Sequence, residues 1–589
     1  MGDTMQPLQT IAPVRFFGGW LKDDRWQRPP PGSRCTRSPL KASVALRNFY
    51  LEYDPASPLS IFVDQNFVSL IDGPTFYMTR EGASIPLKSV ELIEIFQRDG
   101  LSAFGDLDGQ FSIILYDARI DTVHFARDHF GTRPLFVGKS EEGLWFGDRQ
   151  RDILALGKLD RALDQPAISH FLRRSWPLGG TTLLAAIHPS KPGAVEVYRQ
   201  QEPCCLHLIA RSLTTERANA RVINSNLRSL IEESLRSLLV STAGPIGISL
   251  SGGIDSTAVA AITRYLFPQR ELRTFTVGFG DDDPEILGAR TVSKHLGTIH
   301  RELLVTAADL ERSLDRALSI LEIPGGHDEF PCLEMLWRLA QGHCEVLLSG
   351  NGADTLFAGM SVYRFIWWRA RIRQMSRYLV RPTSYPGFEF IECGSRTIPV
   401  HHGERPLAQS VAPYRLSRAT ERTLDHWDER LSVQSGLARH YGLELLMPLC
   451  SRKIIYKALA SRDSLKMSLR QNKRMLRQAI TDLVPERILL RKKGVQQLRY
   501  DGEMVRFLCN QLNVLSETDH PIVHPRGKIA FSDLADRLLR SPDRPTIHEA
   551  WNAISVQKWA AHIFGGSEGF VDPSIRGDAY LADVCGRVR

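Results

Sequence analysis

The chain has 589 residues, of which 43% are hydrophobic and 24% charged, proportions typical of a globular protein with a large core. This length predicts more than one domain. No apolar run approaches the ~20 residues of a membrane-spanning helix, and residues 1–17 lack a secretory signal. The nine scattered cysteines do not resemble a disulfide framework. We therefore expect a cytoplasmic protein without a membrane span.

The net charge of +8 raises the possibility of a nucleic-acid partner. Basic residues are interspersed with acidic ones, however, and no motif of alternating basic and aromatic residues is present. Excess positive charge also attracts smaller anions, such as ATP or an acidic peptide. We predict no nucleic-acid partner.

Residues 13–205 are rich in short β-forming runs separated by turn residues. This pattern predicts an α+β domain built on antiparallel sheets. Residues 1–12 are expected to form an N-terminal extension, and the proline-rich stretch between residues 20 and 40 predicts a surface loop or a disordered insertion. The predicted strands include residues 60–63, 111–116, 122–126 and 134–137.

Residues 215–589 show strands alternating with helices, which predicts an α/β domain with a parallel sheet. Beyond about residue 365 the sequence predicts mostly helix, added to that sheet. The predicted strands are residues 245–250, 274–277 and 346–348, and the predicted helices include residues 227–238, 257–262 and 333–339.

A glycine-rich loop joins the predicted strand at 245–250 to the helix that follows. Its sequence is Ser251-Gly252-Gly253-Ile254-Asp255-Ser256. The glycines allow close approach of a ligand, and the N-terminus of the helix favours an anion. Asp255 would repel bare phosphates, so it implies a bridging Mg²⁺. A turn without a ligand would not require this aspartate, and the loop therefore predicts an ATP site.

A second loop follows the strand at 346–348 and reads Ser349-Gly350-Asn351-Gly352-Ala353-Asp354. In a doubly wound sheet both loops lie at the carboxyl edge, where such folds bind ligands. Asp354 is therefore a candidate for the second carboxylate on the metal. Alone, this loop would be an ordinary turn.

In the order of these motifs the sequence resembles the asparagine synthetase superfamily, which includes β-lactam synthetases and lasso-peptide cyclases. The resemblance implies a glutamine-amidotransferase type 2 (Ntn-hydrolase-like) domain at 13–205 and a PP-loop ATP-pyrophosphatase synthetase domain at 215–589. ATP and Mg²⁺ are the implied cofactors. The matching stretches are residues 107–111, 127–135, 251–256, 275–279, 295–298, 349–359 and 491–495.

The resemblance also implies roles for individual residues. Asp255 and Asp354 would bind the metal, and Lys493 would stabilise negative charge on the adenylate, although its basic neighbours alone would suggest an ordinary surface lysine. Asn351 and Glu429 occupy positions that other branches use for catalysis. The implied cofactor-binding residues are Ser249, Ser251, Gly252, Gly253, Asp255, Ser256, Val277, Ser349 and Gly350.

Three departures from the family pattern bear on the source of the amine. Glutamine-using members begin with a catalytic cysteine, whereas residues 14–20, which look like the first strand, carry phenylalanines at that point. The glutamine-binding Asn-Gly-Glu turn is replaced by Asp72-Gly73-Pro74. Asn351 stands where asparagine-forming members have glutamate and β-lactam-forming members have tyrosine. We predict a degenerate domain without glutaminase activity.

The remaining branch is the lasso-peptide cyclase. Such an enzyme adenylates an Asp or Glu side chain of a precursor peptide, whose own N-terminal amine then closes a macrolactam. The implied partners are that precursor peptide, a leader peptidase and a leader-recognition protein. An ammonia-dependent asparagine synthetase, a β-lactam-synthetase-like amide former and a non-catalytic scaffold remain alternatives.

Overall fold

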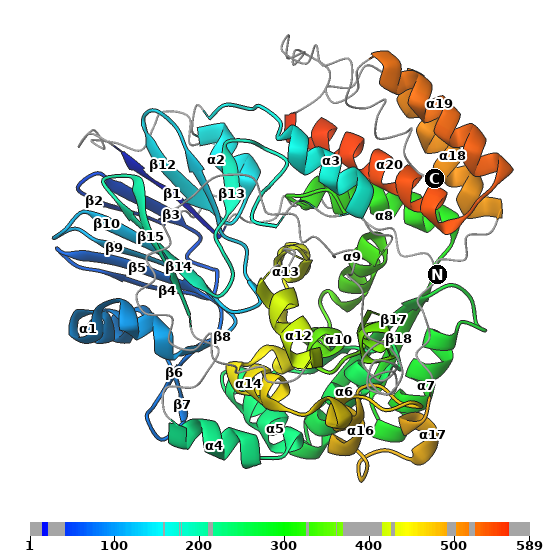
Figure 1. The fold of residues 1–589 in the computed structure, drawn as a ribbon, viewed down its shortest axis with the longest axis horizontal. Coiled ribbons are helices and arrows are strands. Elements are labelled where there is room, and N and C mark those ends of the chain that lie inside the picture. The colour runs from blue at the N-terminus through cyan, green and yellow to red at the C-terminus, as the bar shows by residue number, and fades with distance from the viewer. Residues whose placement is uncertain are drawn as a thin grey trace, which may run out of the picture.

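A computed structural model describes most of the chain, and Figure 1 shows its two parts, a β-rich body and a mixed body of helices and strands. Among the described residues, no helix combines the length and apolar character needed to cross a bilayer. The described residues are 15–21, 42–156, 159–175, 177, 179–209, 216–325, 329–360, 362–368, 415–425, 430–491, 502–517 and 525–564.

Two six-stranded antiparallel sheets form the β-rich body, as the sequence predicted. The first runs in the order β13 (Ile187–Pro189), β11 (Phe136–Lys139), β12 (Gly143–Gly147), β1 (Phe16–Leu21), β3 (Phe49–Tyr53) and β2 (Ala42–Leu46). The second runs β15 (Glu202–Leu208), β14 (Ala194–Arg199), β10 (Thr122–Arg127), β9 (Ser112–Asp117), β5 (Phe67–Asp72) and β4 (Leu59–Val63).

The two sheets pack face to face, and helices cover their outer faces. Alternating side chains of both sheets, such as Phe49 and Phe125, share one core. Helix α1 (Ser89–Asp99) covers the second sheet through Phe96. The first sheet is covered by α2 (Gln150–Leu156), α3 (Gln165–Arg174) and α20 (Arg544–Phe564), and this last helix returns from the far end of the chain. The layers are therefore helix, sheet, sheet, helix.

A five-stranded parallel sheet lies at the centre of the second body. Its order is β18 (Ile299–Leu304), β17 (Leu272–Gly278), β16 (Ile246–Ser249), β19 (Val346–Leu348) and β20 (Glu444–Leu446). Because β16 pairs directly with β19, the two glycine-rich loops that follow these strands are neighbours. The predicted parallel sheet is confirmed, and its order places both loops at one edge.

Helices surround this sheet, as predicted. Most of them pack on the sheet, while α8, α18, α19 and part of α20 form a separate apolar cluster. They are α4 (Glu216–Asn224), α5 (Leu227–Leu238), α6 (Ile254–Leu266), α7 (Pro284–Leu296), α8 (Ala307–Ile320), α9 (Glu329–Ala340), α10 (Ala353–Leu356), α12 (Arg415–Asp425), α13 (Arg430–His440), α14 (Arg452–Ala460), α15 (Asp463–Lys466), α16 (Arg474–Ala479), α17 (Glu486–Leu489), α18 (Gly502–Glu517) and α19 (Pro525–Arg540).

The two bodies meet through a tight interface. The side-chain amide of Gln110 bonds both backbone groups of Met447, at 3.1 Å to the oxygen and 3.0 Å from the nitrogen. Phe130 is fully buried in the core of the parallel-sheet body, although it belongs to the β-rich body by sequence. The small sheet β7 (Ser84–Pro86), β6 (Thr75–Met78) and β8 (Leu107–Gly109) also borders this interface.

Candidate active site

The first glycine-rich loop forms a compact turn between β16 and α6. Gly252 has φ +64°, and a Cβ there would lie 2.4 Å from the backbone of Gly288 on α7, so only glycine fits. The Ser251 and Ser256 hydroxyls lie 3.2 Å apart, and the backbone N–H of Gly253 donates to the Ser251 hydroxyl at 3.3 Å. Gly253 is the N-cap of α6. The loop therefore presents hydroxyls and a helix N-terminus at the same point.

The second loop packs directly against the first. A Cβ on Gly350 would lie 2.8 Å from the backbone nitrogen of Ser256 and 3.0 Å from the Cβ of Asp255. Ser349 is buried, and its hydroxyl accepts a hydrogen bond from the backbone of Asn351 at 3.3 Å. The two loops, about a hundred residues apart in sequence, thus form one surface.

Asp255 and Asp354 converge on a single cation, the ammonium of Lys473. Its Nζ hydrogen-bonds to Asp255 and lies 2.7 Å from Oδ1 of Asp354. Burial lowers the pKa of Lys473, but the two carboxylates outweigh burial and raise it, so the side chain remains charged. Lys473 adopts φ +54°, a left-handed conformation that costs a non-glycine residue about 1–2 kcal/mol. Nothing in the local sequence Asn472-Lys473-Arg474 distinguishes this lysine, and sequence reasoning missed it.

These two carboxylates fit a divalent cation. Oxygen ligands suit Mg²⁺, and the side chains already converge around one positive charge. Both are partly exposed, Asp255 at 20% and Asp354 at 40%, so a ligand can reach them from solvent. Among the described residues no group of three or more His, Cys, Asp or Glu side chains is arranged to hold a metal, which indicates that any metal here takes further ligands from a bound molecule or water.

Asn351 pairs with a glutamine. Its Nδ2 donates to Oε1 of Gln434 on α13 at 2.6 Å, and Gln434 is buried. The buried thiol of Cys450 donates to the backbone oxygen of Asn351 at 3.7 Å, which holds the loop from the other side. Both members of the pair are amides and cannot take up a proton in the neutral range. Sequence reasoning named Asn351 but missed Gln434, which lies 83 positions away.

The other predicted residues lie at different distances from the loops. Ser249 ends β16 immediately before the first loop. Val277 is the next-to-last residue of β17, and its side chain is buried in the apolar cluster of α8, α18 and α20. Arg491 donates to the backbone oxygen of Gly252 at 2.8 Å and so brings the chain back to the first loop. Lys493 and Glu429 lie outside the described residues.

A buried charge cluster lies where the β-rich body meets the parallel-sheet body, and it includes the first residue of the Asp72-Gly73-Pro74 turn. We call it the interface cluster; it contains Arg15, Asp72, Arg133, Arg439 and Glu444. Asp72, from the Asp72-Gly73-Pro74 turn, is fully buried and lies 3.1 Å from Arg15 and 2.7 Å from Arg439.

The arginines of the interface cluster lower the pKa values of its two carboxylates. Burial alone would raise the pKa of Glu444, but Arg133, Arg15 and Arg439 outweigh it and lower the pKa to about 2. The same balance lowers the pKa of Asp72. Both carboxylates therefore remain ionised and tie Arg15, just before β1, and the end of β5 to β20 and α13 of the other body.

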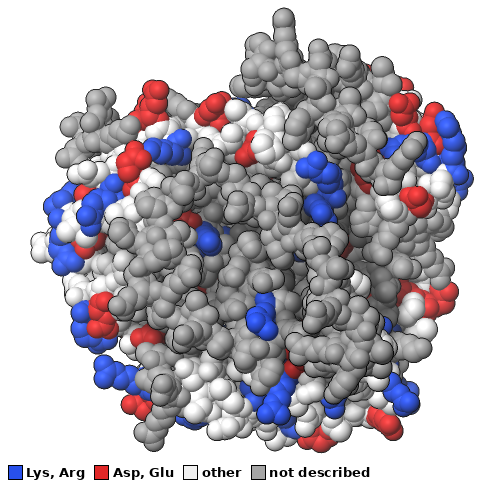
Figure 2. All heavy atoms as spheres, viewed as in Figure 1, with Lys and Arg blue, Asp and Glu red and all other residues white. Residues whose placement is uncertain are grey.

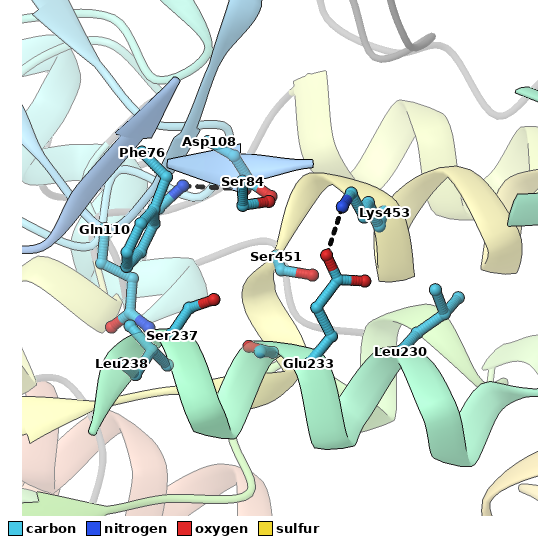
Figure 3. A pocket seen from close by; sticks show the side chains of 12 residues that line it. Phe76, Ser84, Asp108, Gln110, Leu230, Glu233, Ser237, Leu238, Ser451 and Lys453 are labelled. Carbon is cyan, nitrogen blue, oxygen red and sulfur yellow. Dashed lines mark hydrogen bonds and ion pairs between the residues drawn. The ribbon is translucent and has the colours of Figure 1, made fainter. Parts of the chain in front are cut away.

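A small pocket, open to solvent, lies elsewhere on the same interface (Figure 3). Phe76, Asp108 and Gln110 line it from the β-rich body, and Glu233 and Lys453, which form an ion pair, line it from the other. It does not include either glycine-rich loop. Figure 2 shows basic and acidic side chains interspersed over the visible described surface, without a continuous basic band.

Comparison with known proteins identifies the family. Residues 226–560, which include both glycine-rich loops and Lys473, match the asparagine synthase family, and residues 89–206 match a glutamine amidotransferase domain. The chain belongs to the asparagine synthase family. The predicted combination of an amidotransferase-type domain with a synthetase domain is thereby confirmed.

Individual relatives are distant. Asparagine synthetase B [glutamine-hydrolyzing] of Escherichia coli strain K12 is 25% identical over 46% of this chain and 46% of its own length. A putative asparagine synthetase of Mycobacterium tuberculosis is 29% identical over 45% and 42% of the two chains. Asparagine synthetase [glutamine-hydrolyzing] 1 of Bacillus subtilis is 21% identical over 70% of each. The chain thus spans about half the length of the first two relatives.

Proposed function

We propose that this chain is an ATP-dependent ligase that adenylates a carboxylate, releases pyrophosphate, and forms an amide with an amine that its own N-terminal domain does not produce. The observation that carries this proposal is the convergence of the two glycine-rich loops, with Asp255 and Asp354 around one cation position. A merely structural turn would not need two partly exposed carboxylates held together beside a helix N-terminus.

In the proposed reaction a carboxylate oxygen attacks the α-phosphorus of ATP and pyrophosphate leaves. The Ser251 and Ser256 hydroxyls, together with the backbone N–H groups at the start of α6, would bind the departing pyrophosphate. Asp255 and Asp354 would hold Mg²⁺, which supplies charge neutralisation for the phosphates. By the family resemblance, Lys493 would stabilise negative charge at the adenylated carbonyl. An amine then attacks that carbonyl, AMP leaves, and the nitrogen loses one proton.

Loss of glutaminase activity is supported by the interface cluster. An Ntn-type nucleophile requires a thiol or hydroxyl at the start of the first strand, and β1 instead starts at Phe16, after Arg15, whose guanidinium binds Asp72 and Glu444. The carboxylate of Asp72 is engaged by two arginines and would not be free to recognise glutamine. The N-terminal domain would then serve as a scaffold for the synthetase site.

The amide pair of Asn351 and Gln434 supports a particular class of amine. In the proposed site this pair would face the amine, and because neither side chain can take up a proton, the amine would have to arrive unprotonated. A peptide α-amine, with a pKa of about 7.7–8.0, does so in part near neutral pH, whereas a lysine amine, with a pKa of about 10.4, does not. We therefore propose a precursor peptide whose N-terminal amine attacks its own adenylated Asp or Glu side chain, as in lasso-peptide cyclases. Intramolecular attack also raises the effective concentration of the amine.

A second candidate is an ammonia-dependent asparagine synthetase: the names of the relatives support asparagine as the product, although they describe glutamine-hydrolysing enzymes. One assay separates the candidates. Purified full-length protein is incubated with ATP, Mg²⁺ and either aspartate with ammonia, aspartate with glutamine, or synthetic precursor peptides from neighbouring genes.

The proposal expects AMP and pyrophosphate in equal amounts and a peptide lighter by one water molecule, with no requirement for glutamine. Efficient asparagine formation from ammonia would replace the peptide proposal with the second candidate. Asparagine formation from glutamine would contradict the loss of glutaminase activity. A neighbouring leader peptidase and leader-recognition protein would be the expected partners of a peptide substrate.

A further inference from the structure

The position between the two candidate metal-binding carboxylates is already filled by a side chain of the protein. Lys473 Nζ contacts both Asp255 and Asp354, at 2.7 Å from the latter. The Lys473 side chain is only 2% exposed, so it lies beneath the two carboxylates as seen from solvent. These three residues come from α6, α10 and the start of α16.

The surrounding backbone holds Lys473 in this position. A Cβ at Gly359 would lie 2.0 Å from Oδ1 of Asp354 and 2.1 Å from Cε of Lys473, so with glycine here both side chains pack directly over the backbone. The backbone oxygen of Lys473 accepts hydrogen bonds from Leu476 and Arg477, each at 3.0 Å. The lysine backbone is therefore anchored at the N-terminus of α16, and its long side chain provides the freedom to move.

An ammonium and a divalent cation cannot share this position. Mg²⁺ binds oxygen ligands at about 2.0–2.1 Å, so a metal bridging the two carboxylates would lie almost where Nζ lies now. Two cations at such a distance repel strongly in a partly buried site. The metal can enter only if the ammonium leaves, and a buried ammonium leaves readily only toward another anion.

We propose that Lys473 is a built-in counter-ion that fills the metal position while nucleotide is absent, and that the phosphates of ATP draw it away when nucleotide and metal bind together. The displacement of Lys473 by the phosphates rests on the proposed function. If Lys473 fills the metal position until nucleotide binds, metal binding depends on nucleotide. The single ammonium also offsets one of the two negative charges of the adjacent carboxylates in the empty protein.

The test is the binding of Mn²⁺, measured by electron paramagnetic resonance on full-length protein with and without the non-cleavable analogue α,β-methylene-ATP. We expect weak Mn²⁺ binding to the wild type alone and tight binding with the analogue. Lys473→Met removes the charge at similar volume and should bind Mn²⁺ without nucleotide roughly tenfold or more tightly than the wild type. Lys473→Arg keeps the charge and should remain nucleotide-dependent. Lys294→Met, an exposed lysine on α7, is the matched surface control.

Equal nucleotide-free Mn²⁺ affinity in the wild type and in folded Lys473→Met would overturn the inference. Tight Mn²⁺ binding by the nucleotide-free wild type would overturn it without any variant, so the result does not depend on how well the variant folds. If the analogue adds no Mn²⁺ site to the wild type, the proposed ATP site is contradicted. In that case a gain of metal binding in Lys473→Met still supports the counter-ion role.

Discussion

Two groups of carboxylates in this molecule differ in how their charges are balanced. In the interface cluster, Asp72 is fully buried and is bound by Arg15 and Arg439. At the glycine-rich loops, Asp255 and Asp354 are partly exposed and share Lys473. Charges that are buried and surrounded by arginines act in folding, whereas charges left near solvent around one movable cation are suited to a ligand. The comparison indicates a scaffold at the first region and a reactive site at the second.

The largest effect is expected at the loops. Asp255→Asn removes one of the two proposed metal ligands, and we expect ATP–pyrophosphate exchange with an active acid substrate to fall by about 10³-fold. The folded state should lose less than the ~3–5 kcal/mol of a broken buried ion pair, because Asp354 still pairs with Lys473 and the Asp255 carboxylate is partly exposed. Exchange kinetics measure the loss of activity, and thermal melting measures the change in stability. Unchanged exchange would remove Asp255 from the site.

Unlike Asp255→Asn, the Asp72→Asn substitution should reduce the stability of the fold rather than the activity. Two buried arginines lose their common carboxylate, and we expect the free energy of unfolding to fall by about 3–5 kcal/mol. Chemical denaturation measures this loss, and adenylation per folded molecule should remain near that of the wild type. A stable Asp72→Asn protein with impaired adenylation would reverse the assigned roles of the two regions.

The interface also predicts a dependence of stability on pH through Asp148. Burial raises the pKa of Asp148 from 3.8 to about 7, although Arg439 opposes the shift. The folded state therefore favours the protonated form, and its contribution to stability is full below about pH 4 and is lost as the pH rises through about 7. Asp148→Asn should flatten the stability curve between those values by a few kcal/mol. Denaturation midpoints at pH 5 and pH 8 test this, and parallel curves for both proteins would contradict it.

The smallest effect is expected at the amide pair. Gln434→Glu places a proton acceptor beside Asn351 without changing side-chain length, and we expect amide formation below pH 7 to rise by roughly tenfold, while adenylation stays constant. Gln434→Met, which removes the acceptor of the Asn351 hydrogen bond, should instead slow amide formation at every pH. A pH profile of product formation distinguishes the two. An identical profile for wild type and Gln434→Glu would show that the pair does not face the amine.

The sequence predicted correctly those elements that a short stretch of residues identifies by itself. Residues 346–348 form β19 as predicted, and the two glycine-rich loops meet because each follows a strand of one parallel sheet. Lys473 could not be found in this way, since its role depends on a contact with Asp255 across 218 positions. Gln434 and Arg439 were missed for the same reason: both lie on α13, and only the tertiary fold brings them to Asn351 and Asp72.

The most direct test of the proposed chemistry follows the oxygen atoms of the acid substrate. If a carboxylate oxygen attacks the α-phosphorus of ATP, a substrate labelled with ¹⁸O in its reacting carboxylate should transfer one labelled oxygen to AMP for each amide formed. Mass spectrometry of the released nucleotide measures this, and Asp255→Asn serves as the control. Label in AMP is the result that the account predicts. Label in inorganic phosphate, together with ADP, would contradict it.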